Sequence, residues 1–406
     1  MLEENAVQTL PARVAALPLA REAAKPGPKT GRMLFIDNLR LLMIALVVVQ
    51  HAAVTYSGLG SWYYVEHSRL DLISNLLFGV FQAMTQGYFM GLLFLIAGYF
   101  VPGAYDRKGF ARFVKDRLIR LGIPALIYVF GVNPFIQYVL LGPLPGQPSP
   151  MFLKYYLDYL ASGRILSGSG PLWFAIALLA FTVVYALARL VSRPALRPAA
   201  PSRVTAAMTV GLILIIAVGA FAIRLVLPVG TAIYNMQLCY FSSYIVLFAV
   251  GILAYRQQWL NKMPAAAGFG WLRAGLIGGP VSLVALMVAG GVFRQGLAAF
   301  NGGWHWQSAA YALWESFIAV SMSVGLIVLF REKCAGQSRL VKALSDSAFA
   351  VYVFHAPVLI GLSLLMRPLA TIPLVKFLVA AGLALAASFG LAFLVLRRVP
   401  VLKEVL

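Results

Sequence analysis

Residues 36–56 read IDNLRLLMIALVVVQHAAVTY, an apolar stretch that carries an arginine and a histidine eleven positions apart. At about 100° per residue, eleven steps make three turns plus about 20°, so Arg40 and His51 are expected on one helix face, about 16 Å apart along the axis. Asp37 lies three residues before Arg40. Ionisable groups at membrane depth are costly and by default mark a functional site. A cation near one side of the bilayer and a titratable base near the other could hold an anionic donor and activate an acceptor.

The composition around this stretch is that of a membrane protein. Of 406 residues, 61% are hydrophobic and only 11% are charged, against roughly 25% charged in soluble domains. A membrane span needs about 20 mostly apolar residues. We expect an all-α, polytopic membrane protein with about ten transmembrane helices, near 34–56, 74–101, 118–141, 171–191, 205–227, 236–255, 273–293, 308–330, 348–366 and 374–396. Glycines and prolines in the second and third stretches could mark a broken or re-entrant helix.

The net charge of +20 is spread over short loops and does not form the basic, aromatic-interleaved surface that binds single-stranded nucleic acid. We therefore expect no nucleic-acid partner. The basic residues gather in alternate loops and near both ends of the chain, so the positive-inside rule predicts that both termini are cytoplasmic. Residues 1–31 are rich in Ala, Pro and Lys and predict a disordered cytoplasmic tail. A transmembrane domain is expected over 32–400, followed by a cytoplasmic tail over 401–406.

The outer connections are rich in aromatic residues. They include SGLGSWYYVEHSRLD (57–71), MFLKYYLDYL (151–160) and NGGWHWQ (301–307). The second of these predicts a short interfacial helix after a Pro/Gly-rich loop. The aromatic residues fit an ordinary belt at the headgroup level, which we prefer, or a surface that stacks sugars.

His51 has an unperturbed pKa near 6.5 and could accept a proton from a hydroxyl, although a packing histidine is an equal alternative. Glu315 is predicted at a similar depth in the eighth span, and a His51–Glu315 pair would orient the imidazole. Arg40 could clamp an anion or simply form a salt bridge to Asp37. Arg224, at an outer span end, is expected to snorkel.

Arg117 and Arg120 are three residues apart at the start of the third span and share a helix face. They could be ordinary positive-inside anchors, or they could bind a phosphorylated donor from the cytosol. His355 lies inside the predicted ninth span. The four histidines and two cysteines have no metal-ligand spacing, so no metal is expected.

Five ordered elements between residues 33 and 358 resemble the bacterial membrane acyltransferases of the acyltransferase-3 family. They are DNLR (37–40) with His51; FMGLLFLIAGYF (89–100); DRLIRLGIP (116–124); PLWF (171–174); and SDSAFAVYVFHAPV (345–358). The spelling of IDNLR, LIAGYF and RLGIP looks most like the branch called glucan biosynthesis acyl- or succinyltransferase.

The resemblance implies an integral membrane enzyme that O-acylates a carbohydrate of the cell envelope, in the cytoplasmic membrane of a bacterium. It implies that Arg40 and His51 are the essential pair of the first span. Asp37 and Glu315 are further candidate catalytic residues from their positions alone, Asp37 near Arg40 and Glu315 at the depth of His51. Arg117 and Arg120 would bind acyl-coenzyme A, which acts as a co-substrate and not as a permanently bound cofactor. Trp173, Tyr352 and His355 lie in the shared motifs and are predicted to bind substrate.

The predicted function is therefore acyl transfer from cytosolic acyl-coenzyme A to a carbohydrate hydroxyl. A proton-coupled transporter or flippase is the main alternative, because intramembrane His, Arg and Glu also serve transport. A sensor or scaffold without chemistry is the third reading. The sequence is silent on oligomeric state.

Overall fold

The computed structural model describes residues 32–66, 70–143, 150–192 and 204–395. The chain divides into two compact units, Met1–Met33 and Leu34–Leu406, and all the helices below belong to the second. The predicted tails 1–31 and 401–406 lie outside the described residues.

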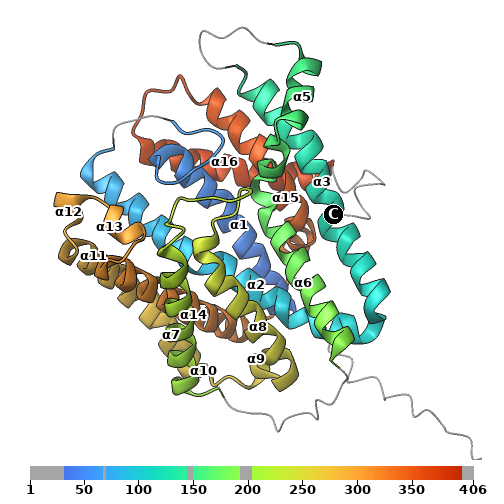
Figure 1. The fold of residues 1–406 in the computed structure, drawn as a ribbon, viewed down its shortest axis with the longest axis vertical. Coiled ribbons are helices and arrows are strands. Elements are labelled where there is room, and N and C mark those ends of the chain that lie inside the picture. The colour runs from blue at the N-terminus through green and yellow to red at the C-terminus, as the bar shows by residue number, and fades with distance from the viewer. Residues whose placement is uncertain (1–31, 67–69, 144–149, 193–203, 396–406) are drawn as a thin grey trace, which may run out of the picture. The chain divides into compact units, whose positions relative to one another are not determined.

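The second unit is built from helices, as its hydropathy predicts (Figure 1). Its membrane-length stretches are α1 (Leu34–Ser57), α2 (Leu72–Arg117) with its continuation to Leu140, η5 and α6 (Gly170–Leu172, Trp173–Val191), α7 (Ala206–Arg224), η6 and α8 (Leu238–Tyr240, Phe241–Gln257), α10, η7 and α11 (Ala265–Arg273, Ala274–Gly278, Gly279–Ala289), α14 (Trp306–Lys333), α15 (Arg339–Leu365) and α16 (Pro373–Leu394). Shorter helices connect them: α5 (Phe152–Ala161), η4 (Arg164–Ser167), α9 (Trp259–Lys262), α12 (Val292–Gln295) and α13 (Ala298–Asn301). The described residues contain no β-strand beyond one isolated bridge, Ile233–Met236.

Within the described residues, nine continuous helical stretches are long and apolar enough to cross a membrane. One of them, Leu72–Leu140, has 69 residues, about three times the length that a span needs. Its path changes at Gly109, whose φ of 70° and ψ of 173° are not helical. The stretch therefore forms two legs, each long enough to cross, which agrees with the prediction of about ten transmembrane helices. An even number returns both ends of the unit to one side, as the positive-inside rule predicts.

The third predicted span stays helical through both of its prolines. It alternates π-helical turns η1 (Leu118–Gly122), η2 (Tyr128–Val132) and η3 (Ile136–Leu140) with the α-helical pieces α3 (Ile123–Ile127) and α4 (Asn133–Phe135). Pro124 and Pro134 stand near the starts of α3 and α4. Because proline has no amide hydrogen to donate, the local winding widens without ending the helix.

The closest helix pair joins α2 and α8, and two glycines make it possible. A side-chain carbon on Gly98 would overlap the carbonyl oxygen of Phe248, and one on Gly251 would overlap that of Leu95. Small residues let membrane helices bring their backbones together in this way. The two backbones are therefore in direct contact near the middle of α2.

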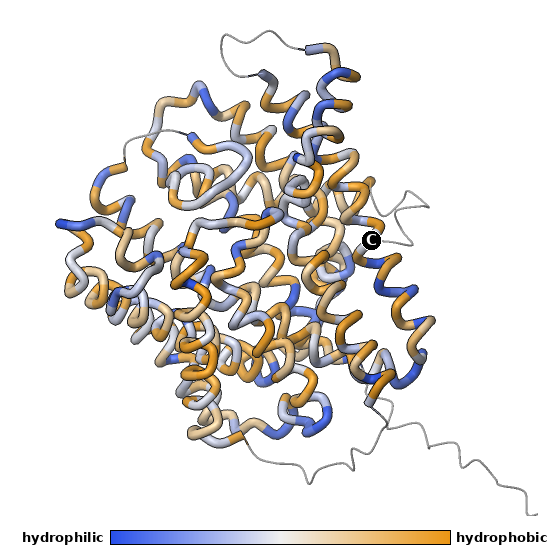
Figure 2. Tube along the Cα trace, in the orientation of Figure 1, coloured by the Kyte–Doolittle hydropathy of each residue, from blue (hydrophilic) through white to orange (hydrophobic). Residues whose placement is uncertain are grey.

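Helix α1 lies against four others, α2, α14, α15 and α16. At its inner end, the Asn38 side chain donates to the carbonyl oxygens of Cys334 (2.7 Å) and Gly336 (2.9 Å) and accepts from Gln337 (2.8 Å). The asparagine of the DNLR motif therefore ties α1 to the connection between α14 and α15. Figure 2 shows that apolar residues follow the helices while hydrophilic ones gather mainly at helix ends and connections.

Replacing Gly98 with alanine should destabilise the protein, because the new methyl group has no space beside Phe248. Overpacking of this kind typically costs about 1–3 kcal/mol, and the thermal unfolding midpoint in detergent should fall by several degrees. Gly382→Ala is the matched control, since nothing lies within 4 Å of its side-chain position. Equal midpoints for the two variants would contradict the close approach of α2 and α8.

Candidate active site

The imidazole of His51, near the outer end of α1, meets a second imidazole from α15. His51 Nδ1 lies 2.9 Å from Nε2 of His355. The other ring nitrogen of His355, Nδ1, lies 2.9 Å from the carbonyl oxygen of Tyr352. The first and the last motif of the sequence thus form one hydrogen-bonded chain.

This chain assigns the proton positions of both rings. A carbonyl oxygen only accepts hydrogen bonds, so His355 Nδ1 must carry a hydrogen. In a neutral ring the opposite nitrogen then accepts, and His355 Nε2 receives its hydrogen bond from His51 Nδ1–H. The remaining nitrogen of His51, Nε2, keeps its lone pair. Fixing one ring nitrogen through a hydrogen bond at the other is how proteins prepare a histidine for acid–base work.

Trp62 covers one face of the His51 ring. The two ring centres are 3.8 Å apart with an interplanar angle of 12°, while those of His51 and His355 are 5.1 Å apart. The centres of Trp62 and His355 are 6.2 Å apart, so the three centres form nearly a right triangle. Trp62 therefore lies above the ring and His355 lies beside it in the ring plane. An aromatic face in this position also stabilises a cation, which here would be the protonated imidazole.

Trp62 is presented by a segment that we call the outer strap, residues Gly58–Glu66. Gly58 and Gly60 have φ values of 68° and 110°, which glycine adopts readily, and they turn the chain back over the end of α1. At its far end, Glu66 donates its backbone N–H to the carbonyl of Thr55 (2.8 Å). Its carboxylate accepts from Lys376 of α16 at 2.6 Å.

The middle of the outer strap is attached to the third span through hydroxyl groups. The Tyr63 hydroxyl donates to the Asn133 side chain (2.7 Å) and lies 3.2 Å from the hydroxyl of Tyr128. Burial raises the pKa of the Tyr63 hydroxyl, so it stays protonated and able to donate. Asn133 in turn donates to Tyr159 of α5 (3.1 Å), and burial raises the pKa of that hydroxyl as well. The predicted helix over 151–160 is confirmed, and it supports this network.

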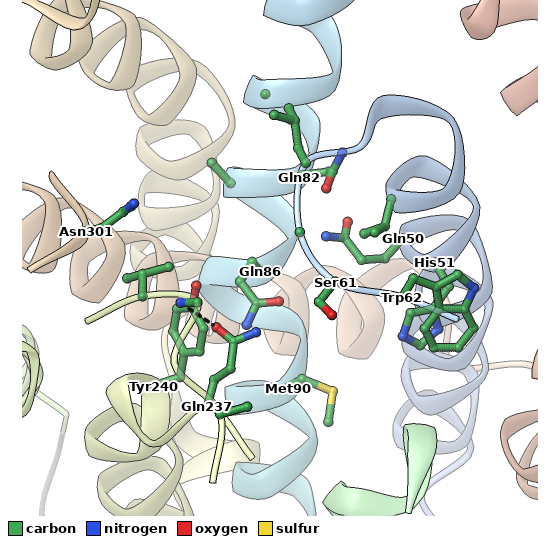
Figure 3. Close-up of a pocket in the computed structure, with 18 of the residues that line it drawn as sticks. Gln50, His51, Ser61, Trp62, Gln82, Gln86, Met90, Gln237, Tyr240 and Asn301 are labelled. Atoms are coloured by element: carbon green, nitrogen blue, oxygen red, sulfur yellow. Dashed lines mark hydrogen bonds between the residues drawn. The ribbon is translucent and has the colours of Figure 1, made fainter. Parts of the chain in front are cut away.

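A cavity of about 1420 Å³ borders His51. Figure 3 shows Trp62 and His51 at one side, the glutamines of α2 across the middle and Asn301 at the far side. Much of the wall consists of amide and aromatic side chains: Gln50, Gln82, Gln86, Gln137, Gln237, Asn75, Asn133, Asn235, Asn301, Trp62, Trp173, Tyr63, Tyr155, Tyr240 and Tyr311. Among the described lining residues, Arg164 alone carries a formal charge. Gln50 is 7% exposed and its side-chain oxygen lacks a partner in the structure.

The structure brings the residues predicted to bind substrate to this cavity or next to it. Trp173 and Tyr352 line the wall, and Trp173 stacks on Tyr244 with ring centres 5.7 Å apart. The Tyr352 hydroxyl donates to the carbonyl of Pro171, which joins the PLWF motif to the motif of His355. His355 does not border the cavity but contacts His51, which does.

Arg40, Arg117 and Arg120 form a separate group near the opposite end of α1. The guanidinium of Arg117 interacts electrostatically with both other arginines. Arg40 is 3.8 Å from Asp37, and its side chain is 52% exposed. The alternative of an Asp37–Arg40 salt bridge is thus present, but at that exposure it is weak and leaves the guanidinium accessible. None of the three arginines borders the cavity at His51.

The predicted pair of His51 and Glu315 is wrong, as is the expectation that Arg224 snorkels. Glu315 forms an ion pair with Arg224, whose side chain is 0% exposed. Arg224 also lies 5.6 Å from the ring centre of Tyr240 and 5.4 Å from that of Tyr311. A guanidinium buried at an apolar helix end gains more from a carboxylate and two aromatic faces than from a strained reach to water. Glu315 therefore supports the cavity wall behind these tyrosines and does not orient His51.

Sequence reasoning missed the anchors of the outer strap. Lys376 is only 4% exposed in its side chain and stands in a predicted span, where an ionisable residue signals a specific partner. Trp62 was visible as part of an aromatic outer connection, yet the preferred explanation was a headgroup belt. Trp62 and Tyr63 instead line the wall of the cavity at His51. Trp304 is 82% exposed and is compatible with a belt.

Comparison with known protein families gives one match, which covers most of the chain. The model of the family Acyl_transf_3, described as an acyltransferase domain, matches residues 33–397. The chain belongs to this family and is a multi-pass membrane acyltransferase, as the motifs predict. No curated protein and no solved structure matches it.

Removing one partner of the Arg224–Glu315 pair should destabilise the protein strongly. Glu315→Leu leaves a buried guanidinium without its carboxylate, which typically costs about 3–5 kcal/mol. The double variant Arg224→Met/Glu315→Leu should recover most of the thermal stability and keep substantial activity. If the double variant folds well but has no activity, the ion pair takes part in catalysis, and its role is not only to support the cavity wall.

His355 should act as a positioning residue that can be replaced by another hydrogen-bond acceptor. His355→Phe removes the acceptor for His51 Nδ1–H, and turnover should fall by about 10–100-fold, as for other supports of a functional histidine. His355→Gln retains a side-chain oxygen and should recover part of the rate. If both variants lost the same turnover at equal thermal stability, the hydrogen bond from His51 to residue 355 would not be the cause of the loss.

Proposed function

We propose that this protein transfers an acyl group from acyl-coenzyme A to a hydroxyl group of a neutral carbohydrate. The observation that carries the proposal is the chain Tyr352–His355–His51, which leaves a single basic nitrogen on a histidine that borders a large cavity with amide side chains in its wall. Family membership supports acyl transfer as the reaction class. It also favours an enzyme over the transporter and scaffold alternatives.

The chemistry of the cavity wall supports a carbohydrate acceptor. Side-chain amides both donate and accept hydrogen bonds, which suits hydroxyl groups, and aromatic faces suit the apolar faces of sugar rings. Since Arg164 is the one formally charged lining residue described, a neutral sugar fits better than a strongly anionic one. Gln50, with its unpartnered side-chain oxygen, is placed one residue from His51 and is available to accept from a hydroxyl.

In this mechanism His51 Nε2 removes the proton of the acceptor hydroxyl while the hydroxyl oxygen attacks the thioester carbonyl carbon. The new ester C–O bond forms, the C–S bond breaks, and the proton on His51 passes to the departing thiolate. His355 Nε2 accepts from His51 Nδ1–H throughout, and the face of Trp62 stabilises the protonated ring. A positioned general base of this kind typically contributes about 10²–10⁴ in rate.

The group of Arg40, Arg117 and Arg120 is proposed to bind the phosphates of coenzyme A, because guanidinium geometry matches phosphate oxygens. The group lies toward the end of α1 that the positive-inside rule assigns to the cytoplasm. A rise of 1.5 Å per residue puts Arg40 and His51 about 16 Å apart, and an extended pantetheine arm could span this distance. Donor and acceptor would then approach from opposite sides.

The proposed location is the cytoplasmic membrane of a bacterium, and the proposed acceptor is a cell-envelope carbohydrate. Both follow from the resemblance of the first-span, second-span and third-span motifs. The glucan biosynthesis branch stays a prediction from the spelling of IDNLR, LIAGYF and RLGIP.

Turnover of acetyl- and succinyl-coenzyme A by the purified protein in liposomes tests the proposal. His51→Ala should lower kcat by about 10²–10⁴, the usual contribution of a general base. Arg40→Ala should chiefly raise KM for the coenzyme A ester. Arg273→Ala, which changes another exposed arginine of the predicted inner side, is the control and should match the parent protein.

Full turnover by His51→Ala at unchanged stability would exclude His51 as the base. If Arg273→Ala lost coenzyme A binding as strongly as Arg40→Ala, Arg40, Arg117 and Arg120 would not form a specific phosphate site. Positive charge anywhere on the inner side would then explain the binding.

A further inference from the structure

The cavity beside His51 has two chemically different parts. Near the histidine, amide and aromatic side chains such as Gln50, Trp62 and Tyr63 line the wall. A second part of the wall, which we call the apolar arm, consists of the apolar lining residues of α2 (within 72–83), of α11 (within 283–288), and of α12 and α13 (within 292–300). Asn75, Gln82 and Asn301 stand beside this part, which is otherwise lined by aliphatic side chains, Met287, Phe293 and Phe300.

The apolar arm opens toward the surface of the membrane helices. Leu76 is 51% exposed, Val288 is 55% exposed and Phe293 is 76% exposed, although all three line the cavity. Leu76 belongs to a helix long enough to cross a bilayer, and so does Val288. In a membrane these exposed apolar side chains contact hydrocarbon. Exposed apolar side chains of this kind give the cavity a wall that a hydrocarbon chain can contact.

The two helices touch on the inner side of the arm. At the start of α11, Gly279 meets the Met84 side chain of α2, because a side-chain carbon on the glycine would be 3.0 Å from the Met84 sulfur. From there α11 runs toward the outer connection 290–305, and α2 runs back toward the outer strap. The arm residues of α2 precede Met84 and those of α11 follow Gly279, so the arm lies on the outer side of this contact.

We propose that the acceptor is a neutral glycolipid, whose sugar occupies the polar part beside His51 and whose hydrocarbon chain leaves through the apolar arm between α2 and α11. This proposal rests on the proposed function and specifies its acceptor. A soluble sugar would use only the amide-lined part and would leave the apolar arm without a role. Burying hydrocarbon there is favourable only relative to water, so the arm mainly aligns a lipid already in the bilayer.

A long acyl group of the donor is the rival occupant. The proposed donor site, at Arg40, Arg117 and Arg120, lies toward the opposite end of α1. The apolar arm opens beside the outer connection instead, where a membrane-anchored acceptor would arrive. The position of the arm thus favours the acceptor.

The test compares methyl β-glucoside with hexadecyl β-glucoside as acceptors for the full chain in nanodiscs, with acetyl- or succinyl-coenzyme A as donor. Val284→Trp fills the apolar arm, whereas Val281→Trp adds the same ring one turn away on α11, at an exposed residue that does not border the cavity. The ratio of kcat/KM for the long-chain over the methyl acceptor should fall at least tenfold in Val284→Trp and stay unchanged in Val281→Trp. Because both variants share the same bilayer, partitioning of the glycolipid cancels in this comparison.

A binding measurement separates this proposal from the proposed function. Hexadecyl β-glucoside with a diazirine at the end of its chain should label peptides from 72–83 and 283–297 of the His51→Ala variant, and Val284→Trp should reduce that labelling. Labelling without any turnover in the parent protein would overturn the acyl-transfer proposal and keep the glycolipid site.

Two results would overturn the glycolipid site itself. One is an unchanged acceptor ratio in Val284→Trp together with no labelling of these peptides. The other is a selective loss of palmitoyl-coenzyme A use relative to acetyl-coenzyme A in Val284→Trp, which would assign the apolar arm to the donor.

Discussion

A polar group inside a bilayer must find its partner within the protein, because no water is present to supply one. The hydrogen bond between His51 and His355 answers this requirement and also determines which nitrogen of His51 remains basic. Its direction follows from the Tyr352 carbonyl, which accepts from His355. The same contact holds α1 against α15. Packing and chemistry therefore depend on one short chain of hydrogen bonds.

Two buried ion pairs hold the parts of the cavity in place around that chain. Lys376 fastens the end of the outer strap through Glu66, and the strap lays Trp62 over His51. Arg224 and Glu315 brace the wall behind Tyr240 and Tyr311. Such pairs stabilise little relative to apolar packing, yet losing one partner is costly. Any position of the outer strap or of the cavity wall that separates one of these pairs would leave a charge without its partner, so the pairs hold both segments in the observed positions.

The long helices separate two functions along one axis. Arg40 and His51 stand on α1 about three turns apart, and α2 runs beside α1 and packs closely against α8 at two glycines. The arginine group lies at one end and the cavity at the other. In the proposed reaction this separation lets a charged donor and a sugar acceptor reach the same base from different sides.

Hydropathy alone determined the class of fold and the approximate positions of the long apolar helices, because a bilayer demands about 20 apolar residues per span whatever the neighbours are. The positions of Arg40, His51, Arg117 and Arg120 along their helices were also readable, because the helical period fixes which residues share a face. The partners were not. Glu315 was the predicted partner of His51, whereas in the tertiary structure Glu315 pairs with Arg224 and His355 contacts His51. Depth in the membrane follows from position along one helix, but contact depends on how helices rotate and pack, which neighbouring side chains decide together.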